Sequence, residues 1–445
     1  MLKLYLKCFF VLFVVCSFYT YSQSTFKLPK GQKKEKVRFK LVSNLIIIPV
    51  EVNGIELSFI LDTGVNKPIL FNLSDNDSLE VKNIEEIYIR GLGEGEAVKA
   101  LHSKGNFFKI GDIYNNYQDL YMVLDQEINL SPRLGIPVHG IIGFDLIKDF
   151  VLDINYMTKT VKFHNRLYYE PKKCRKCEEF PIELIQNKAY VDAYVSSEEA
   201  LKIPVRLLLD SGNSDALWLF PNEEKNIKIP EKSFRDYIGR GLSGNIYGSR
   251  ARVKSFQLGN FSLKEAKVAF PDSISISPIK NIKERDGSLG GDVLKRFHVT
   301  LDYQSRKIRL RKNSKFKERF KYNMSGIEVQ HNGIRYVKER EANVFGVVER
   351  NNDASGNVQI LLTDLFKILL PPAIEIAEIR EGSPAAEVGL KKGDILITIN
   401  GKQTYKHSLQ EVIEMLNEKE GRRIRLVIER EGRELSFLFE LKRVL

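Results

Sequence analysis

The chain has 445 residues, more than the roughly 250–300 at which a single hydrophobic core stops growing, so we expect two or three domains. With 43% hydrophobic and 28% charged residues, its composition excludes a disordered chain or a membrane-embedded one. The net charge of +12 comes from basic residues spread along the chain without a nucleic-acid-binding motif, so we expect no nucleic-acid partner.

The N-terminus has the pattern of a secretory signal. Lys3 and Lys7 precede the apolar run CFFVLFVVCSF, and small residues follow in TYSQS. We expect a signal peptide over residues 1–22 and a linker over residues 23–43. The run is shorter than the about 20 residues of a membrane span, so we expect no transmembrane span after cleavage; a retained anchor is the alternative. The expected location is the periplasm, the cell envelope or the extracellular space.

The middle of the chain is an internal repeat. GIIGFDLIKDFVLDINYMTKTVKFH, from Gly140, aligns without a gap with GSLGGDVLKRFHVTLDYQSRKIRLR, from Gly287. Upstream, LSFILDTGVNKPILF aligns with VRLLLDSGNSDALWLF. Aliphatic and β-branched runs separated by turn residues predict mostly strands in both copies. We therefore expect two small closed β units, over residues 44–166 and 188–312.

A lysine-rich linker, residues 167–187, is expected between the two copies. It contains Cys174 and Cys177, the only cysteines outside the expected signal peptide. A structural zinc site takes four ligands, and the six histidines are scattered along the chain. We expect no metal or other cofactor, and a local disulfide in an oxidising compartment.

Each copy carries one carboxylate at the end of an apolar run, in Leu61-Asp62-Thr63-Gly64 and in Leu209-Asp210-Ser211-Gly212. A buried, unpaired carboxylate is costly, so a partner is expected. If the two turns meet across a pseudo-twofold axis, the carboxylates lie side by side, cannot both ionise and share one proton. The ionised member can then activate water as a general base while the protonated member donates toward a scissile carbonyl.

These paired motifs resemble the two lobes of pepsin-like aspartic peptidases, and each copy is similar to the retroviral-type aspartyl protease domain. The resemblance implies a mainly β, bilobal double β-barrel in which one chain, as a monomer, completes the site. It implies Asp62 and Asp210 as the catalytic dyad and a polypeptide as the substrate. It also implies supporting roles for the turn residues Thr63, Gly64, Ser211 and Gly212 and for the glycines Gly143 and Gly290.

Two further features follow from the same resemblance. The glycine-rich stretches GLGEGE and GRGLSGNIYG would be hairpin flaps over the substrate. The chain departs from the family at Val65 and Asn213, where a small residue or serine is usual after the glycine. These two positions leave the hydrogen bonding of the carboxylates, and hence activity, open.

From about residue 316 the pattern changes. GSPAAEVGL, KKGDILITINGK and a helix that begins at a capping box formed by Ser408 and Glu411 resemble a PDZ domain. We place this domain at 316–445, with an insertion around 331–372 whose apolar stretch LLTDLFKILLPP is expected to pack over the groove.

A PDZ domain binds an extended peptide as an added strand and captures its C-terminal carboxylate with backbone N–H groups. The resemblance therefore implies a C-terminal peptide ligand; a PDZ fold that only packs against the peptidase is the alternative. The candidate peptide-binding residues are Met324, Ser325, Gly326, Ile327 and Leu409.

The sequence as a whole predicts an exported bacterial aspartic endopeptidase whose PDZ domain positions protein substrates or partners. The alternative is a catalytically inactive, protease-like scaffold in which the PDZ groove carries the function. Close approach of the Asp62 and Asp210 carboxylates would favour the enzyme.

Overall fold

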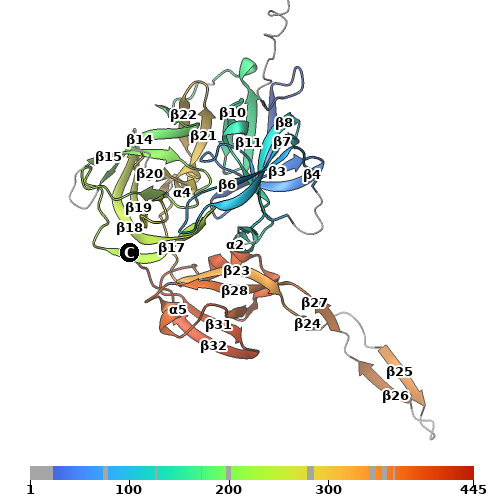
Figure 1. The fold of residues 1–445 in the computed structure, drawn as a ribbon. Coiled ribbons are helices and arrows are strands. Elements are labelled where there is room, and N and C mark those ends of the chain that lie inside the picture. The colour runs from blue at the N-terminus through green and yellow to red at the C-terminus, as the bar shows by residue number, and fades with distance from the viewer. Residues whose placement is uncertain are drawn as a thin grey trace, which may run out of the picture.

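The computed structural model describes residues 24–73, 79–125, 128–171, 173–196, 202–277, 285–340, 347–352, 358–363 and 366–445. The expected signal peptide, residues 1–22, lies outside the described residues. The described part is mainly β, with two similar halves followed by a smaller C-terminal domain, which confirms the expected fold class (Figure 1).

Each repeat is built on an eight-stranded sheet with the same strand order. The first sheet runs β2-β3-β4-β9-β5-β8-β7-β6 and the second runs β13-β14-β15-β20-β16-β19-β18-β17. The strands of the first are β2 (Lys40–Val42), β3 (Leu45–Val52), β4 (Ile55–Leu61), β5 (Ile69–Leu70), β6 (Ile84–Ile89), β7 (Val98–Ile110), β8 (Ile113–Val123) and β9 (Gly140–Ile142). Those of the second are β13 (Glu183–Ile185), β14 (Lys188–Ser196), β15 (Lys202–Leu209), β16 (Leu217–Leu219), β17 (Ser233–Gly241), β18 (Gly244–Leu258), β19 (Phe261–Pro271) and β20 (Gly287–Leu289).

A six-stranded sheet of order β1-β11-β10-β21-β22-β12 joins the two repeats. At its centre β10 pairs antiparallel with β21, so each repeat contributes three strands to one shared core. Its strands are β1 (Lys34–Arg38), β10 (Phe150–Asn155), β11 (Thr160–Asn165), β12 (Cys177–Pro181), β21 (Phe297–Asp302) and β22 (Lys307–Lys312). A short helix follows each of Gly143 and Gly290, namely α3 (Phe144–Ile147) and α4 (Gly291–Leu294).

The two expected linkers, 23–43 and 167–187, are instead parts of the repeats. The first contains β1 and β2, and the second contains β12 and β13. Both β1 and β12 are edge strands of the joining sheet, where charged residues are common because one side of the backbone faces water. Because these segments are rich in lysine and glutamate, the sequence did not identify them as strands with buried residues such as Val37 and Phe180. The disulfide joins Cys174 and Cys177, as expected.

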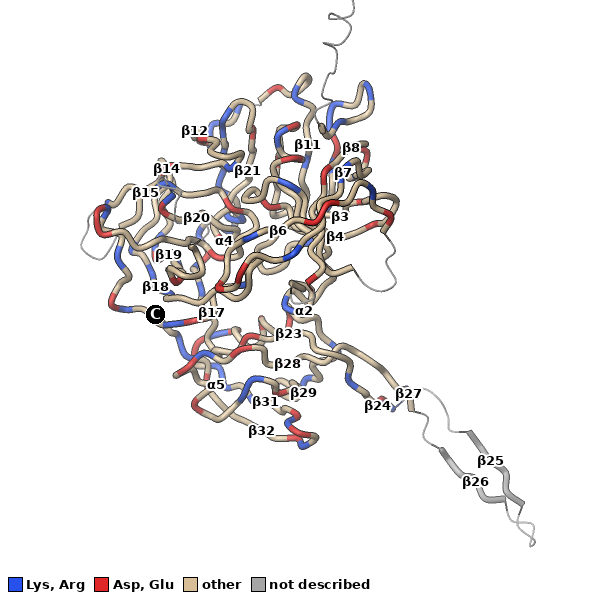
Figure 2. The backbone as a smooth tube through the Cα atoms, viewed as in Figure 1, with Lys and Arg blue, Asp and Glu red and all other residues tan. Residues whose placement is uncertain are grey.

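The C-terminal domain is a sheet of order β23-β28-β29-β31-β32, with β30 paired to β29. Its helix α6 begins at the predicted capping box of Ser408 and Glu411. The elements are β23 (Ile327–Ile334), β28 (Pro372–Ile379), β29 (Ile395–Ile399), β30 (Lys402–Gln403), β31 (Arg423–Arg430), β32 (Arg433–Glu440), α5 (Pro384–Glu387) and α6 (Leu409–Met415). Basic and acidic residues are interspersed over both repeats and the C-terminal domain (Figure 2).

The insertion between β23 and β28 forms two hairpins that extend away from the body of the molecule (Figure 1). They pair β24 (Val337–Arg340) with β27 (Phe366–Leu369), and β25 (Val347–Asn352) with β26 (Val358–Thr363). The expectation that LLTDLFKILLPP packs over the groove is therefore wrong for the β27 part, because that part is held in a ribbon that extends away from the domain. The helix α2 (Ser131–Leu134) of the first repeat lies against β23 instead.

Candidate active site

Each predicted aspartate follows a central strand of its own repeat. β4 and β15 end just before Asp62 and Asp210, and they pair in parallel with β9 and β20. The Asp62 N–H donates to the carbonyl of Ile142 (2.9 Å), and the Asp210 N–H donates to that of Leu289 (3.0 Å). The same strand pairing therefore fixes the backbone of both aspartates.

The predicted glycines allow the following loop to press against these turns. A Cβ on Gly143 would lie 2.1 Å from the carbonyl oxygen of Asp62, and one on Gly290 would lie 2.3 Å from that of Asp215. Real Cβ atoms do not approach backbone oxygens so closely, so both positions require glycine. The loops that support the two aspartates thus depend on equivalent residues in the two repeats.

The structure brings the two turns together through reciprocal hydrogen bonds. The Thr63 hydroxyl donates to the carbonyl of Leu209 (2.6 Å), and the Ser211 hydroxyl donates to that of Leu61 (2.7 Å). In return, the Thr63 N–H donates to Ser211 Oγ (3.1 Å) and the Ser211 N–H to Thr63 Oγ1 (3.0 Å). All four bonds are buried, so they lock the turns across the pseudo-twofold axis.

The two carboxylates face the same small space. The Gly64 N–H donates to Asp62 Oδ1 (2.7 Å). A Cβ on Gly64 would lie 3.1 Å from Asp62 Oδ1 and 3.3 Å from Asp210 Oδ1, and a Cβ on Gly212 would lie 2.2 Å from Asp62 Cγ. A side chain at Gly212 would therefore displace the Asp62 carboxylate, and one at Gly64 would be tight against both carboxylates. The side chains of both aspartates stay partly accessible to solvent.

The electrostatics of this pair oppose double ionisation. Burial and the neighbouring Asp210 carboxylate raise the pKa of Asp62 to about 7. Burial also raises the pKa of Asp210, against the nearby charge of Arg285 and a hydrogen bond from Ser288. Two adjacent carboxyl groups of this kind hold one proton between them over a wide pH range.

The departures at Val65 and Asn213 do not supply hydrogen bonds to the carboxylates. The carbonyl of Val65 accepts from the Phe144 N–H (2.9 Å), and Asn213 Oδ1 accepts from the Asp215 N–H (2.9 Å). For Asp210 that role falls to the Ser288 hydroxyl, which in turn accepts from Arg285 Nη2 (2.6 Å). Arg285 was not predicted from the sequence. It could have been noticed in the alignment of the two copies, because the first copy has Val138 at the same position.

The two glycine-rich stretches form hairpin tips, as expected, and the tips are joined to each other. The Ser243 N–H donates to the carbonyl of Leu92 (2.9 Å), and the Gly95 N–H donates to that of Ser243 (2.7 Å). Leu242 packs with the apolar cluster of the first repeat, and Leu92 packs with that of the second. Each tip thus crosses to the opposite repeat.

The predicted peptide-binding residues of the C-terminal domain are all buried: Met324, Ser325, Gly326, Ile327 and Leu409. The backbone N–H groups of the first four donate within the domain. The acceptors are Asn417 Oδ1 for Met324 (2.7 Å), Asn323 Oδ1 for Ser325 (3.1 Å) and Gly326 (2.9 Å), and Ser325 Oγ for Ile327 (3.2 Å). A peptide carboxylate would have to replace these side chains.

The first repeat also contacts this region directly. Helix α2 lies against β23, and a Cβ on Gly135, which follows α2, would lie 2.5 Å from Leu409 Cβ. The Arg133 guanidinium lies 3.8 Å from Glu378 Oε1 and 4.4 Å from the ring of Tyr237. The peptidase-like part and the C-terminal domain therefore pack together where the PDZ groove was predicted.

The Gly135→Ala substitution tests this contact. Gly135 has a φ of +70°, so the backbone strain of alanine costs about 1–2 kcal/mol, and the clash with Leu409 adds about 1–3 kcal/mol. Gly31→Ala is the matched control, because Gly31 has a φ of +85° and nothing within 4 Å of an added Cβ. Denaturant unfolding should show the larger loss for Gly135→Ala; equal losses would contradict the contact.

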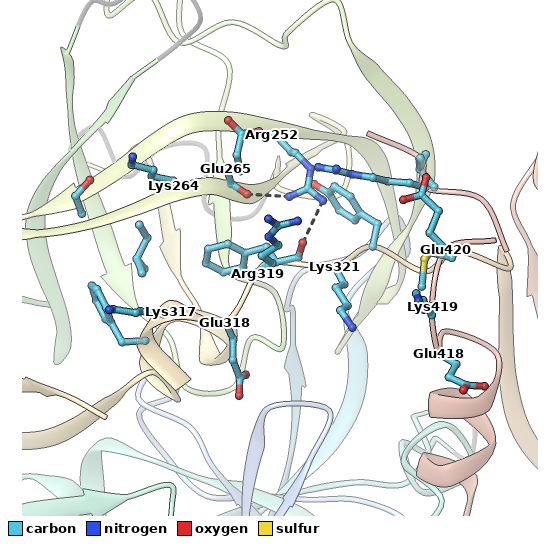
Figure 3. A pocket seen from close by; sticks show the side chains of 18 residues that line it. Arg252, Lys264, Glu265, Lys317, Glu318, Arg319, Lys321, Glu418, Lys419 and Glu420 are labelled. Carbon is cyan, nitrogen blue, oxygen red and sulfur yellow. Dashed lines mark hydrogen bonds between the residues drawn. The ribbon is translucent and has the colours of Figure 1, made fainter. Parts of the chain in front are cut away.

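A separate pocket lies between the second repeat and the C-terminal domain (Figure 3). Its lining mixes basic residues such as Arg252 and Lys419 with acidic ones such as Glu265 and Glu418, and it includes neither aspartate of the dyad. Within the described ranges, no group of three or more His, Cys, Asp or Glu side chains is arranged to hold a metal ion. None of the described helices is both long and apolar enough to span a membrane.

Comparisons with known families agree with this architecture. Residues 48–146 and residues 193–293 each match the family model described as aspartyl protease, and residues 375–430 match the one described as PDZ domain. No curated protein sequence matches the chain. The two aspartyl protease matches fall on the two repeats and include Asp62 and Asp210, one in each. The chain therefore contains two segments similar to the aspartyl protease family, one in each repeat, followed by a segment similar to a PDZ domain.

Proposed function

We propose that the protein is an exported aspartic endopeptidase that hydrolyses peptide bonds with the Asp62/Asp210 dyad. The observation that carries this proposal is the reciprocal locking of Thr63 and Ser211, which holds the two carboxylates at one point. A duplicated fold that used its aspartates only to cap turns would not need a glycine at 212 to make room for the Asp62 carboxylate of the opposite repeat.

The chemistry follows from the shared proton. The ionised carboxylate accepts a proton from a water molecule as its oxygen attacks the scissile carbonyl carbon, and the protonated carboxyl donates to the carbonyl oxygen. The resulting tetrahedral intermediate collapses as the C–N bond breaks and the amide nitrogen receives a proton from the dyad. The joined hairpin tips must separate for a polypeptide to enter.

Export is supported by the signal pattern of residues 1–22 and by the disulfide, which is typical of oxidising compartments. N-terminal sequencing of the mature protein tests it, with Gln23 expected as the first residue. We propose that the PDZ domain positions protein substrates or partners. Its close packing against α2 favours a second role, in which the PDZ fold supports the first repeat.

The pH dependence of cleavage tests the proposed function. Because the singly protonated dyad is the active form and the pKa of Asp62 is raised to about 7, kcat/KM should fall about tenfold per pH unit above that value. The measurement is kcat/KM for one peptide from acidic to alkaline pH. A rate that instead keeps rising above neutral pH would indicate a single general base and contradict a proton-sharing pair.

A further inference from the structure

The two repeats present different chemistry on the two sides of the dyad. The difference is visible because strand pairing fixes which residues are equivalent. The first repeat places Leu45, Ile47 and Val138 where the second places Lys188, Tyr190 and Arg285.

The first two equivalences follow from β3 and β14. These strands pair with β4 and β15, which end just before the dyad aspartates. Ile47 of β3 lies opposite Ile60, and Tyr190 of β14 lies opposite Leu208. Ile60 and Leu208 each stand two residues before the aspartate of their repeat. Ile47 and Tyr190 therefore occupy the same position, as do the residues two places before them, Leu45 and Lys188.

The third equivalence follows from β9 and β20, which pair with the other edges of β4 and β15. Gly140 opens β9 opposite Phe59, and Gly287 opens β20 opposite Leu207. Val138 and Arg285 each precede the opening glycine by two residues. An apolar side chain in one repeat thus stands where the other has a guanidinium.

The side formed by the first repeat is apolar throughout. Leu45, Ile47 and Val138 are buried in one hydrophobic cluster, against which Leu242 of the opposite hairpin tip packs. These side chains offer no polar group to a ligand. Charged groups of a substrate would be unfavourable there.

The side formed by the second repeat is cationic. Arg285 is only 8% exposed, and its guanidinium donates to Ser288 Oγ (2.6 Å) and to the carbonyl of Gly287 (3.2 Å). In the described part of the chain no carboxylate lies within 4 Å of it. A buried guanidinium without a close counter-ion is costly, and the carboxylates whose charge acts on Arg285 are Asp210 and Asp62 of the dyad.

A second cation and a free hydroxyl lie beside it. Lys188 is half-buried, has no ion-pair partner among the described residues, and interacts with Arg285 and with both dyad aspartates. The buried Tyr190 hydroxyl has no hydrogen-bond partner in the described part of the structure, although it lies near Arg285 and Asp210. Two cations and one unused donor therefore face a dyad that carries a single negative charge once it holds its proton.

We propose that Lys188, Tyr190 and Arg285 form a substrate subsite that binds a carboxylate next to the scissile bond. A carboxylate there would supply the missing negative charge and accept from the Tyr190 hydroxyl. The group can be a glutamate or aspartate side chain of the polypeptide, or the free carboxylate of a chain end. Lys188 and Arg285 are specificity-determining residues in this proposal, which rests on the proposed peptidase function.

Matched peptides test the subsite in the full-length protein. Peptides that differ only by Glu or Gln at each position flanking the cleavage site, and a Gln peptide with a free or an amidated C-terminus near that site, distinguish the two sources. We expect the carboxylate member of at least one pair to have a kcat/KM about 10- to 100-fold higher. Lys188→Met and Arg285→Met should bring this ratio close to one, whereas Lys202→Met, an exposed lysine on β15, should preserve it.

Two outcomes would overturn the subsite. One is equal cleavage of all matched pairs by the wild-type protein. The other is a pair of variants that slow every peptide alike and shift the pH profile without changing the Glu/Gln ratio, which would mean that the cations only tune the dyad. Because Lys188 is partly exposed, its variant remains informative if the variant of the buried Arg285 does not fold.

Binding separates failure of the subsite from failure of the proposed function. The Asp62→Asn protein is titrated with the same peptides by calorimetry. Tighter binding of the carboxylate peptide, lost on adding Lys188→Met, supports the subsite even if the wild-type protein cleaves nothing, in which case the proposed function fails alone. Equal binding of both members of every pair contradicts the subsite.

Discussion

Asp62→Asn and Asp210→Asn are each expected to lower kcat/KM for peptide cleavage by at least about 10³-fold. An amide at either position cannot exchange a proton with water or with the scissile carbonyl, and the dyad needs one ionised and one protonated carboxyl. The substitutions change neither the size of the side chains nor the bonds between Thr63 and Ser211. The measurement is initial cleavage rates of one peptide at pH 6.

Stability measurements show whether such a loss is specific. The folded pair holds its proton to a higher pH than an unfolded chain, whose aspartates titrate at about 4. The raised pKa of Asp62 therefore lowers the free energy of unfolding as the pH rises from there to about 7. Asp62→Asn should be at least as stable as the wild type at pH 8 and yet inactive. A variant that keeps most of its activity would refute the assignment.

The second large effect is expected at Asp292. Asp292→Asn should lower the free energy of unfolding by about 3–5 kcal/mol, because it leaves the half-buried Lys267 and Lys295 without their buried counter-charge. The Asp292 carboxylate lies 2.9 Å from Lys267 Nζ and 2.8 Å from Lys295 Nζ, and it is 4% exposed. Burial alone would raise the pKa of Asp292, but the charges of the two lysines hold this pKa well below its usual range. Chemical denaturation at pH 7 measures the loss.

Asp292 also anchors the active-site turn, since its N–H donates to the carbonyl of Asp215 (3.2 Å) at the start of α4. The contribution of the Asp292 carboxylate to the free energy of unfolding is present above the pKa of an unfolded aspartate. It is lost as the pH falls through the pKa of Asp292 in the folded protein. The difference from wild type should therefore shrink in acid. Glu85→Ala, which removes an exposed pair with Lys104, is the control and should cost less than about 1 kcal/mol. Equal losses for the two variants would contradict this role.

The central features of the site could be predicted because the chain contains them twice. The alignment of Asp62 with Asp210, each followed by a small hydroxyl residue and glycine, predicted a pair that neither motif alone would establish. The apolar runs before each aspartate predicted the buried strands β4 and β15. The helices α3 and α4 also follow Gly143 and Gly290, the glycines to which the family resemblance gave supporting roles.

Other features could not be predicted, because they depend on contacts distant in sequence. The strands β1 and β12 have polar sequences, and only their pairing at the edges of a shared sheet reveals them as strands. Arg285 and Lys188 do not stand out in a basic chain. Only the strand register of the two repeats shows that they occupy the positions of the apolar Val138 and Leu45. The contact of Gly135 with Leu409 joins residues of different domains.

In the proposed mechanism, Asp62 and Asp210 share one proton within a single chain. NMR titration of the protein with ¹³C-labelled aspartate carboxyls, assigned with Asp62→Asn and Asp210→Asn, tests it without a known substrate. We expect the pair to retain one proton until the pH approaches 7, where both signals shift together. Two carboxyls that titrate independently near the ordinary aspartate value would contradict it.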